Sequence, residues 1–192
     1  NGAKNNTIQN NTITLNRSYA NSFGIYSSTR HTATSVSGAA EATSAAGAHT
    51  DNKVYGNSIS NVNLGICLIG ANADAVMDTG FDIGGAASGT GNTFSNWGNT
   101  AVAGSFLNVS GTVFCAYLFN QKSINFSYNT VTSASLNSAS ATRGIFLNYG
   151  TAPTSGSFTN TISNNTVTLT TTAAPTFEMI RHAGMSTVLS GV

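Results

Sequence analysis

The sequence predicts an all-β fold, a parallel β-helix (solenoid) of about five coils with long loop insertions. Three observations support it: one Asn-Thr-rich phrase recurs along the chain, a second apolar phrase follows most of its copies, and the composition favours regular β structure. Only 7% of the residues are charged, 40% are hydrophobic and two are proline. Disordered chains are poorer in hydrophobic residues, and linkers are richer in proline. The many Thr, Asn, Ser and Gly residues therefore indicate strands joined by tight turns.

The first phrase reads NTIQNNTITL over residues 6–15 and returns as NTISNNTVTL over residues 160–169. Looser copies cover residues 52–60 and 123–132, and a degraded copy runs from Asn92 to Ala101. Anchored on the second asparagine of each copy, at positions 11, 57, 99, 129 and 165, the predicted repeat steps are 46, 42, 30 and 36 residues. Such uneven steps predict coils that carry loops of different length.

Strand alternation explains why the phrase suits stacked coils. Ile13 and Leu15 are expected to point inward, and the threonines beside them outward. Coils stacked about 4.8 Å apart would place the inward residues of successive copies in one interior ladder. That predicted ladder consists of Ile13, Ile59, Val131 and Val167. The corner asparagines are expected both to adopt left-handed backbone and to bond their equivalents in neighbouring coils.

The second phrase supplies a third strand for each coil. It reads FGIY at 23–26, LGICL at 64–68 and RGIFL at 143–147, with a looser FEMI at 177–180. Cys67 lies in one such apolar run, and Cys115 lies in the run Val113–Ala116. We predict that both cysteines are small buried hydrophobic residues and not partners in a disulfide.

These phrases resemble the right-handed parallel β-helix repeats of pectate-lyase-like proteins. They resemble especially the Asn-rich repeats in large secreted or cell-surface, adhesin-like proteins of gliding or type IX-secreting bacteria. The resemblance covers nearly the whole chain and implies a right-handed solenoid. Composition suggests an extracellular or cell-surface location. Because the sequence opens on Asn1-Gly2, we expect residues 1–192 to be a single β-helix segment of a longer chain, with flanking coils of that chain as partners.

The function expected from this scaffold is structural or adhesive, with loops displayed for contact with glycans or other surface proteins. The alternative is a fragment of a polysaccharide lyase or glycoside hydrolase of the same fold, because many activities share it. Arg143 and Arg181 come nearest to the basic residues of such enzymes. Regular alternation would place Glu178 and His182 on the face opposite Arg181. We assign no catalytic residue, and an enzyme is the less favoured interpretation.

Residues 71–91 contain the best candidate for a metal site. Asp74, Asp78 and Asp82 recur every four residues and, within a loop, could converge on Ca²⁺, which binds several oxygen ligands. The alternative is a solvated acidic loop. No other cofactor is expected. The other long stretch outside the repeat, residues 30–50, is expected to be an excursion from the first coil.

Charge and hydropathy exclude other classes of partner. The net charge is +1 and the basic residues are scattered, which argues against nucleic acid. No apolar run approaches the roughly 18 residues of a membrane span. One further alternative is ice binding, because the outward hydroxyls resemble the Thr-x-Thr arrays of ice-binding solenoids. That array, expected to break at Ala101, comprises Thr12/Thr14, Ser58/Ser60, Thr130/Thr132 and Thr166/Thr168.

Overall fold

The computed structural model describes residues 1–30, 41–99, 112–136, 141–150, 153, 158–171 and 176–184. These residues form no α-helix, and their regular structure is almost entirely β-strand. Three short 3₁₀ helices interrupt the strands: η1 (Ala45–Gly47), η2 (Asp74–Val76) and η3 (Ser88–Thr90). The predicted all-β class is confirmed.

The strands form three five-stranded sheets and one two-stranded sheet, and every pairing is parallel. Sheet 1 contains β1 (Thr7–Gln9), β4 (Lys53–Tyr55), β8 (Asp82–Ile83), β12 (Asn125–Ser127) and β15 (Thr161–Ser163). Sheet 2 contains β2 (Thr12–Thr14), β5 (Ser58–Ser60), β9 (Thr93–Ser95), β13 (Thr130–Leu136) and β16 (Thr166–Thr171). Sheet 3 contains β3 (Phe23–Ser28), β6 (Leu64–Ile69), β10 (Thr112–Phe119), β14 (Ala141–Asn148) and β17 (Thr176–Ala183). The small sheet pairs β7 (Asp78–Thr79) with β11 (Gln121–Lys122).

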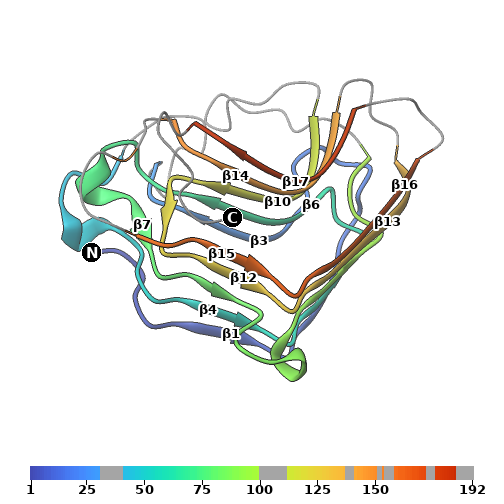
Figure 1. Cartoon of the computed structure of the whole chain (residues 1–192), viewed down its shortest axis with the longest axis horizontal. Coiled ribbons are helices and arrows are strands. Elements are labelled where there is room, and N and C mark those ends of the chain that lie inside the picture. The colour runs from blue at the N-terminus through green and yellow to red at the C-terminus, as the bar shows by residue number, and fades with distance from the viewer. Residues whose placement is uncertain are drawn as a thin grey trace.

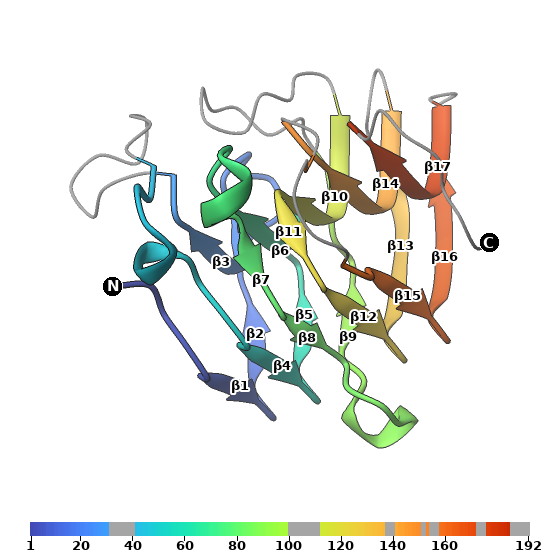
Figure 2. The same cartoon turned by 60° about the vertical axis from the view of Figure 1, so that its left-hand side comes forward.

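The chain passes through sheets 1, 2 and 3 in that order and then repeats the passage. We call one such passage a rung. Figure 1 shows the strands of sheets 1 and 3 facing each other, with sheet 2 along the right-hand side. Figure 2 shows successive rungs displaced along one axis, so that equivalent strands lie side by side. Stacked parallel sheets visited in a fixed order are consistent with a β-helix solenoid.

Strand pairing corrects the predicted alignment of the third repeat. Thr93 of β9 pairs with Ser58 on one side and Thr130 on the other. Asn92, and not Asn99, is therefore the repeat asparagine of the third rung. The steps between repeat asparagines become 46, 35, 37 and 36 residues, much more even than the sequence predicted. The error arose because the rung's sheet 1 strand, β8, lacks the Asn-Thr signature and lies within residues 71–91, which were predicted to be a loop.

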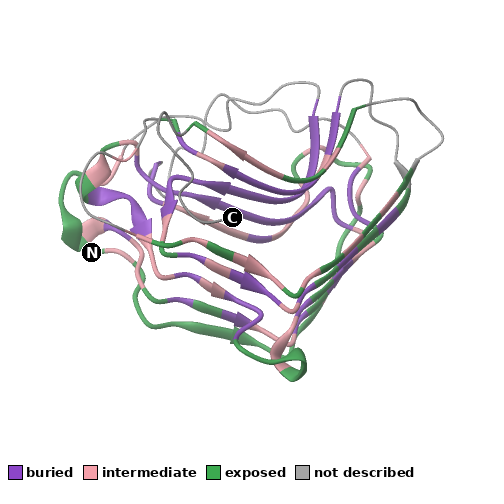
Figure 3. Ribbon diagram, viewed as in Figure 1, coloured by how far each residue is buried: buried purple, intermediate pink, exposed green. Residues whose placement is uncertain are grey.

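The main core lies between the sheets. The predicted interior ladder of Ile13, Ile59, Val131 and Val167 is confirmed, and Phe94 fills its third position. Sheet 1 contributes a parallel row in which Val54, Ile83 and Phe126 are buried. Leu15 departs from the prediction, because it follows the end of β2 and is 45% exposed. Burial is greatest in the middle rungs, as Figure 3 shows, because each rung needs a neighbour on both sides.

The middle strands of sheet 3 are buried on both faces of the sheet. All residues of β6 and β10 are buried, as expected for strands that read as continuous apolar runs. Cys115 belongs to the main core, whereas Cys67 belongs to a second cluster on the other face of the sheet. Both are free and buried, as predicted, and burial raises the pKa of both thiols.

The Gly-Ile phrase of β3, β6 and β14 marks a bend in sheet 3, at a position where β10 has Cys115-Ala116 and β17 has Met179-Ile180. A Cβ atom on Gly65 would lie 2.7 Å from Cδ1 of Phe94, and Gly24 and Gly144 approach Ile59 and Val167 in the same way. Glycine thus lets sheet 3 approach the inward side chains of sheet 2. In β10, Cys115 and the next residue, Ala116, both face the main core, so alternation is broken at this point. Residues three apart across the bend can therefore lie on one face.

A ladder of asparagines runs through the corner between sheets 1 and 2. Each backbone N–H and side-chain Nδ2 donates to Oδ1 of the asparagine in the next rung, at 2.8–3.2 Å. The ladder consists of Asn11, Asn57, Asn92, Asn129 and Asn165. Left-handed backbone falls on the preceding residue in four of these corners, at Asn10, Gly56, Tyr128 and Asn164. The sequence predicted that one asparagine would both adopt left-handed backbone and bond its equivalents in neighbouring rungs. In these corners the first role belongs to the residue before the ladder asparagine, and the second to the ladder asparagine itself.

Candidate functional site

The acidic trio does not form one site. Asp74 lies in η2 and forms an ion pair with Lys122, Asp78 lies in β7 and is buried, and Asp82 begins β8 on the outward face of sheet 1. Residues 71–91 form two strands and two 3₁₀ helices, so the even spacing of the aspartates does not place them on one face. Within the described residues, no three His, Cys, Asp or Glu side chains are grouped so that they could hold a metal ion.

Asp78 is completely buried and hydrogen-bonded on both carboxylate oxygens. Its Oδ1 accepts the backbone N–H of His49 at 2.8 Å and the hydroxyl of Thr29 at 3.2 Å. Its Oδ2 accepts Nε2 of Gln121 at 3.3 Å, across the β7–β11 pair. Burial raises the pKa of this carboxyl, although these hydrogen bonds oppose the rise. Asp78 therefore joins three rungs and is closed to solvent.

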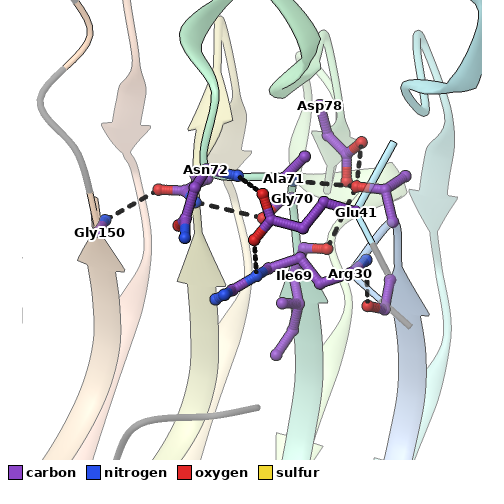
Figure 4. A network of polar contacts seen from close by, with 11 residues as sticks. Arg30, Glu41, Ile69, Gly70, Ala71, Asn72, Asp78 and Gly150 are labelled. Atoms are coloured by element: carbon purple, nitrogen blue, oxygen red, sulfur yellow. Dashed lines mark hydrogen bonds and ion pairs between the residues drawn. The ribbon is translucent and has the colours of Figure 1, made fainter. Parts of the chain in front are cut away.

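A second polar network lies beside Asp78, at the carboxyl ends of the sheet 3 strands (Figure 4). Arg30 Nε donates to Glu41 Oε1 at 2.6 Å, and Glu41 Oε2 accepts the backbone N–H of Asn72 at 3.0 Å. Asn72 Oδ1 in turn accepts Nδ2 of Asn120 at 2.9 Å. The Arg30 guanidinium lies 5.2 Å from the ring centroid of Phe119. The chain of contacts connects successive rungs, which is a structural role.

Asp82 forms a polar cluster on the outward face of sheet 1. Its carboxylate accepts the hydroxyl of Tyr55 and, at 2.7 Å, Nδ2 of Asn125 in the next rung. The pKa of Tyr55 rises to about 12, first because of burial and then because of its hydrogen bond to Asp82 and the negative charge there. This cluster links β4, β8 and β12 across the sheet.

Arg143, Glu178 and Arg181 meet on the outer face of sheet 3. Glu178 forms ion pairs with both arginines, so the prediction that it lies opposite Arg181 is wrong. The reason is the bend of sheet 3 at the position of the Gly-Ile phrase, which β17 fills with Met179-Ile180. Burial opposes ionisation, but the hydrogen bonds and charges of the two guanidinium groups hold the pKa of Glu178 below its ordinary value. Arg143 also lies 4.7 Å from the ring centroid of Phe146.

His182 does lie on the other face, as alternation predicted. Its ring packs 5.9 Å from that of buried Tyr149, and burial lowers the pKa of the imidazole. The charged residues of β17 are therefore divided between two faces. One carboxylate held between two guanidinium groups is an ion-pair cluster and lacks the two separated carboxyl groups that glycoside hydrolysis uses.

The most regular exposed feature is the outward face of sheet 2, which we call the hydroxyl face. Its two columns, one from the first and one from the third position of each repeat strand, are exposed or half-exposed. They are Thr12, Ser58, Thr93, Thr130 and Thr166, and Thr14, Ser60, Ser95, Thr132 and Thr168. The prediction that the array breaks in the third rung is wrong, because that rung contributes Thr93 and Ser95 to the two columns. Ala101 itself lies outside the described residues.

The sequence predicted the hydroxyl columns in four rungs and missed those of the third. Parallel pairing sets the rungs about 4.8 Å apart, and alternation sets the columns about 6.6 Å apart. Within the described chain, one hydrogen bond joins two of these hydroxyls, those of Thr14 and Ser60, whose oxygens lie 3.0 Å apart. The remaining hydroxyls form two regular columns on the outward face of the sheet.

No family model matches this chain, and searches among curated proteins and solved structures found no match. In the part of the chain that the structure describes, no helix is long and apolar enough to cross a membrane. Function must therefore be argued from the geometry alone.

Proposed function

We propose that the chain is a structural and adhesive module of a large secreted or cell-surface protein. In this proposal it forms a right-handed parallel β-helix of about five coils, continued by flanking coils of its parent chain. Its hydroxyl face and its loops contact glycans or other surface proteins. The observation that carries the proposal is the unbroken double column of hydroxyls on sheet 2.

The hydroxyl face suits a ligand with repeated polar groups. Each Ser or Thr hydroxyl can donate one hydrogen bond and accept others, as sugar hydroxyls do. Its position is fixed by the backbone ladder, so little conformational freedom is lost on binding. A single contact would be weak, but many contacts at a fixed spacing add up against an extended polysaccharide.

The charged residues support a module more than an enzyme. Asp74, Asp78, Asp82, Glu41 and Glu178 each bond to a cation or hydrogen-bond donor of another strand or loop. These contacts connect rungs to one another. A polysaccharide lyase or hydrolase would need its catalytic coils in another part of the parent chain.

Ice binding is a second candidate, favoured by one observation. The hydroxyl columns continue through the third rung, where the sequence had predicted a break. An array with spacings of about 4.8 and 6.6 Å presents hydroxyl donors and acceptors at regular intervals to water as well as to sugars. The adhesive proposal predicts a glycan or another surface protein as ligand, and the second candidate predicts ice. Both predict that the ligand binds the hydroxyl face.

A lysine scan of the two outward faces tests the proposal. Thr132→Lys in the middle of the hydroxyl face is compared with Thr161→Lys, a matched change at an exposed position of sheet 1. Binding to insoluble polysaccharides is measured by co-sedimentation, and binding to ice by thermal hysteresis. We expect Thr132→Lys to abolish retention and Thr161→Lys to preserve it. Equal behaviour of the two variants, or no retention of the unaltered chain, would contradict the proposal.

A further inference from the structure

We propose that the ligand of the hydroxyl face is a neutral, extended polysaccharide whose chain lies along the axis of the stack and crosses the strands of sheet 2. This inference rests on the proposed adhesive role of that face and deepens it. It concerns the charge of the ligand and the direction in which the ligand lies.

The hydroxyl face differs in charge from the outward faces of the other two large sheets. All ten side chains of its two columns are Ser or Thr, and none of them is ionisable. By contrast, Lys53 and Asp82 are neighbours on the outward face of sheet 1. Arg143, Glu178 and Arg181 meet on the outer face of sheet 3. Carboxylates are bound most strongly by basic side chains, and the two columns contain none, so a neutral ligand suits this face better than an acidic one.

Arg17 lies beside the hydroxyl face, but its guanidinium is engaged by the protein backbone. Its Nη1 donates to the carbonyl of Gly98 at 3.4 Å and to the carbonyl of Ala134 at 3.3 Å. Gly98 follows β9 and Ala134 belongs to β13, so this side chain connects the third rung with the fourth. The two hydroxyl columns themselves remain uncharged.

Most hydroxyls of this face are available to a ligand. Apart from Thr14 and Ser60, which bond each other, they form no hydrogen bond with any described residue. The hydroxyls on sheet 1 differ, because the oxygens of Ser127 and Ser163 lie 2.9 Å apart and Ser127 also donates to Oδ1 of Asn125. Hydroxyls that bond within a sheet connect its rungs, whereas those of the hydroxyl face keep their donors and acceptors for an external partner.

Threonine, which occupies seven of the ten positions, suits a sugar in two ways. Its branched Cβ restricts the χ1 angle, so little rotamer freedom is lost on binding. It also places a methyl group beside each hydroxyl. The hydroxyl can bond the hydroxyls of a sugar, while the methyl group contacts the C–H groups of the ring.

The arrangement of the columns favours a ligand that crosses the strands. A chain lying along one strand would meet only the two hydroxyls of that rung. A chain along the stack axis meets every rung at intervals of about 4.8 Å, over a column about 19 Å long. The loop that contains η3 projects from the corner between sheets 1 and 2 and bounds the face on that side (Figure 2). Contacts repeated along the axis therefore add up, whereas contacts along a strand end at the corner.

Reversing the sign of an added charge tests the neutrality of the ligand. Thr132→Lys and Thr132→Asp, in the full chain, are compared by co-sedimentation with cellulose and chitin, which are neutral, and with cross-linked alginate, which is acidic. We expect cellulose or chitin, and not alginate, to retain the unaltered chain. Both charges should weaken that retention about tenfold or more, because either one displaces hydrogen bonds and finds no opposite charge. Thr161→Lys and Thr161→Asp, at an exposed position of sheet 1, are the matched controls and should change little.

The outcomes separate this inference from the adhesive role itself. Retention on alginate that Thr132→Lys strengthens and Thr132→Asp weakens would overturn the neutral ligand and leave the adhesive role in place. Absence of retention on all three polymers would overturn both.

Interruption of one column tests the direction of the ligand. Thr93 lies in the third rung, with two rungs on either side, and its side chain is exposed. A ligand along the axis must cross this position, so we expect Thr93→Lys to weaken retention about tenfold or more. A ligand along a strand would still find four intact rungs and lose little. Affinity for soluble oligosaccharides of the retained polymer, measured by calorimetry, should also rise with length until the column is covered. Unchanged retention of a folded Thr93→Lys chain, or affinity independent of length, would refute the axial direction.

Discussion

Asn57 and Asn92 occupy adjacent steps of one ladder, with the backbone N–H and Nδ2 of Asn57 both donating to Oδ1 of Asn92 at 3.0 Å. This contact fixes the third rung in register with the second. It also shows that the repeat is nearly regular after its first step. The unevenness read from the sequence came from choosing Asn99 in place of Asn92.

Asn92 should be a sensitive position for stability. Asn92→Ala would leave the buried backbone N–H of Asn57 without an acceptor and remove one of the two acceptors of Asn57 Nδ2. It would also remove the Nδ2 donor to Val54 O and to Asn129 Oδ1, which keep the backbone N–H groups of Gly84 and of residue 92. A buried unsatisfied group costs about 1–3 kcal/mol and each further lost hydrogen bond about 1 kcal/mol, so we expect a loss of about 3 kcal/mol or more in the free energy of unfolding. Urea denaturation measures it. Asn11→Ala, at the exposed end of the ladder, should cost less than half as much, and equal costs would contradict the account.

The glycine at the bend of β6 should resist even a methyl group. Gly65→Ala would place Cβ 2.7 Å from Cδ1 of Phe94 and 3.1 Å from the carbonyl of Cys115. Overpacking of this kind costs about 1–3 kcal/mol, and we expect the same range here. Gly89→Ala is the control, because nothing lies within 4 Å of its added Cβ. Thermal unfolding of the two variants should differ clearly, and a neutral Gly65→Ala would show that the bend can relax.

Asp78 should make stability depend on pH. Its pKa in the folded chain lies above the value of about 3.9 for an unfolded aspartate, so the folded state holds the proton more tightly. Its contribution to stability is therefore largest at pH values below about 3.9 and is lost as the pH rises through the folded-state pKa. We expect Asp78→Asn to remove this loss, so that its stability falls less between pH 4 and pH 8 than that of the unaltered chain. Denaturant midpoints across this range measure the slope, and identical slopes would contradict the prediction.

Calcium should have little effect on this chain. Asp74, Asp78 and Asp82 have separate partners and separate surroundings, so few oxygen ligands are available at any one point. We expect ~1 mM calcium, a range in which extracellular sites are occupied, to shift the midpoint of thermal unfolding by less than about 1 °C. Magnesium serves as the matched control. A clear shift specific to calcium, lost in Asp74→Asn, would restore the predicted cation site.

The sequence predicted the features that depend on local pattern. Alternation in the Asn-Thr-Ile phrase identified the interior ladder of Ile13, Ile59, Val131 and Val167, and continuous apolar runs identified the buried cysteines. It missed β8 because Asp82-Ile83 is short and has no asparagine before it. The match of Asn92-Thr93-Phe94 to the phrase was the signal that could have placed the third rung.

Features set by contacts between sheets could not be predicted in the same way. Glu178 and Arg181 share a face because sheet 3 bends where Gly144 and its equivalents approach the side chains of sheet 2. No spacing rule in a single strand contains that information. The four-residue spacing of the three aspartates did not indicate where they lie in the fold, for a related reason. A four-residue spacing has meaning only within one regular element, and the three aspartates lie in three.

The corner between β8 and β9 accommodates a longer connection than its neighbours do. Residues 84–92 join β8 to β9, whereas residues 56–57 make the same connection one rung earlier, and the ladder passes through Asn57 and Asn92 without a gap. The scaffold thus tolerates extra residues at this corner at no cost to its register. Foreign peptides grafted between Gly85 and Gly91 would be presented at a fixed position along the stacked strands, which makes the chain a candidate carrier for displayed epitopes or binding loops.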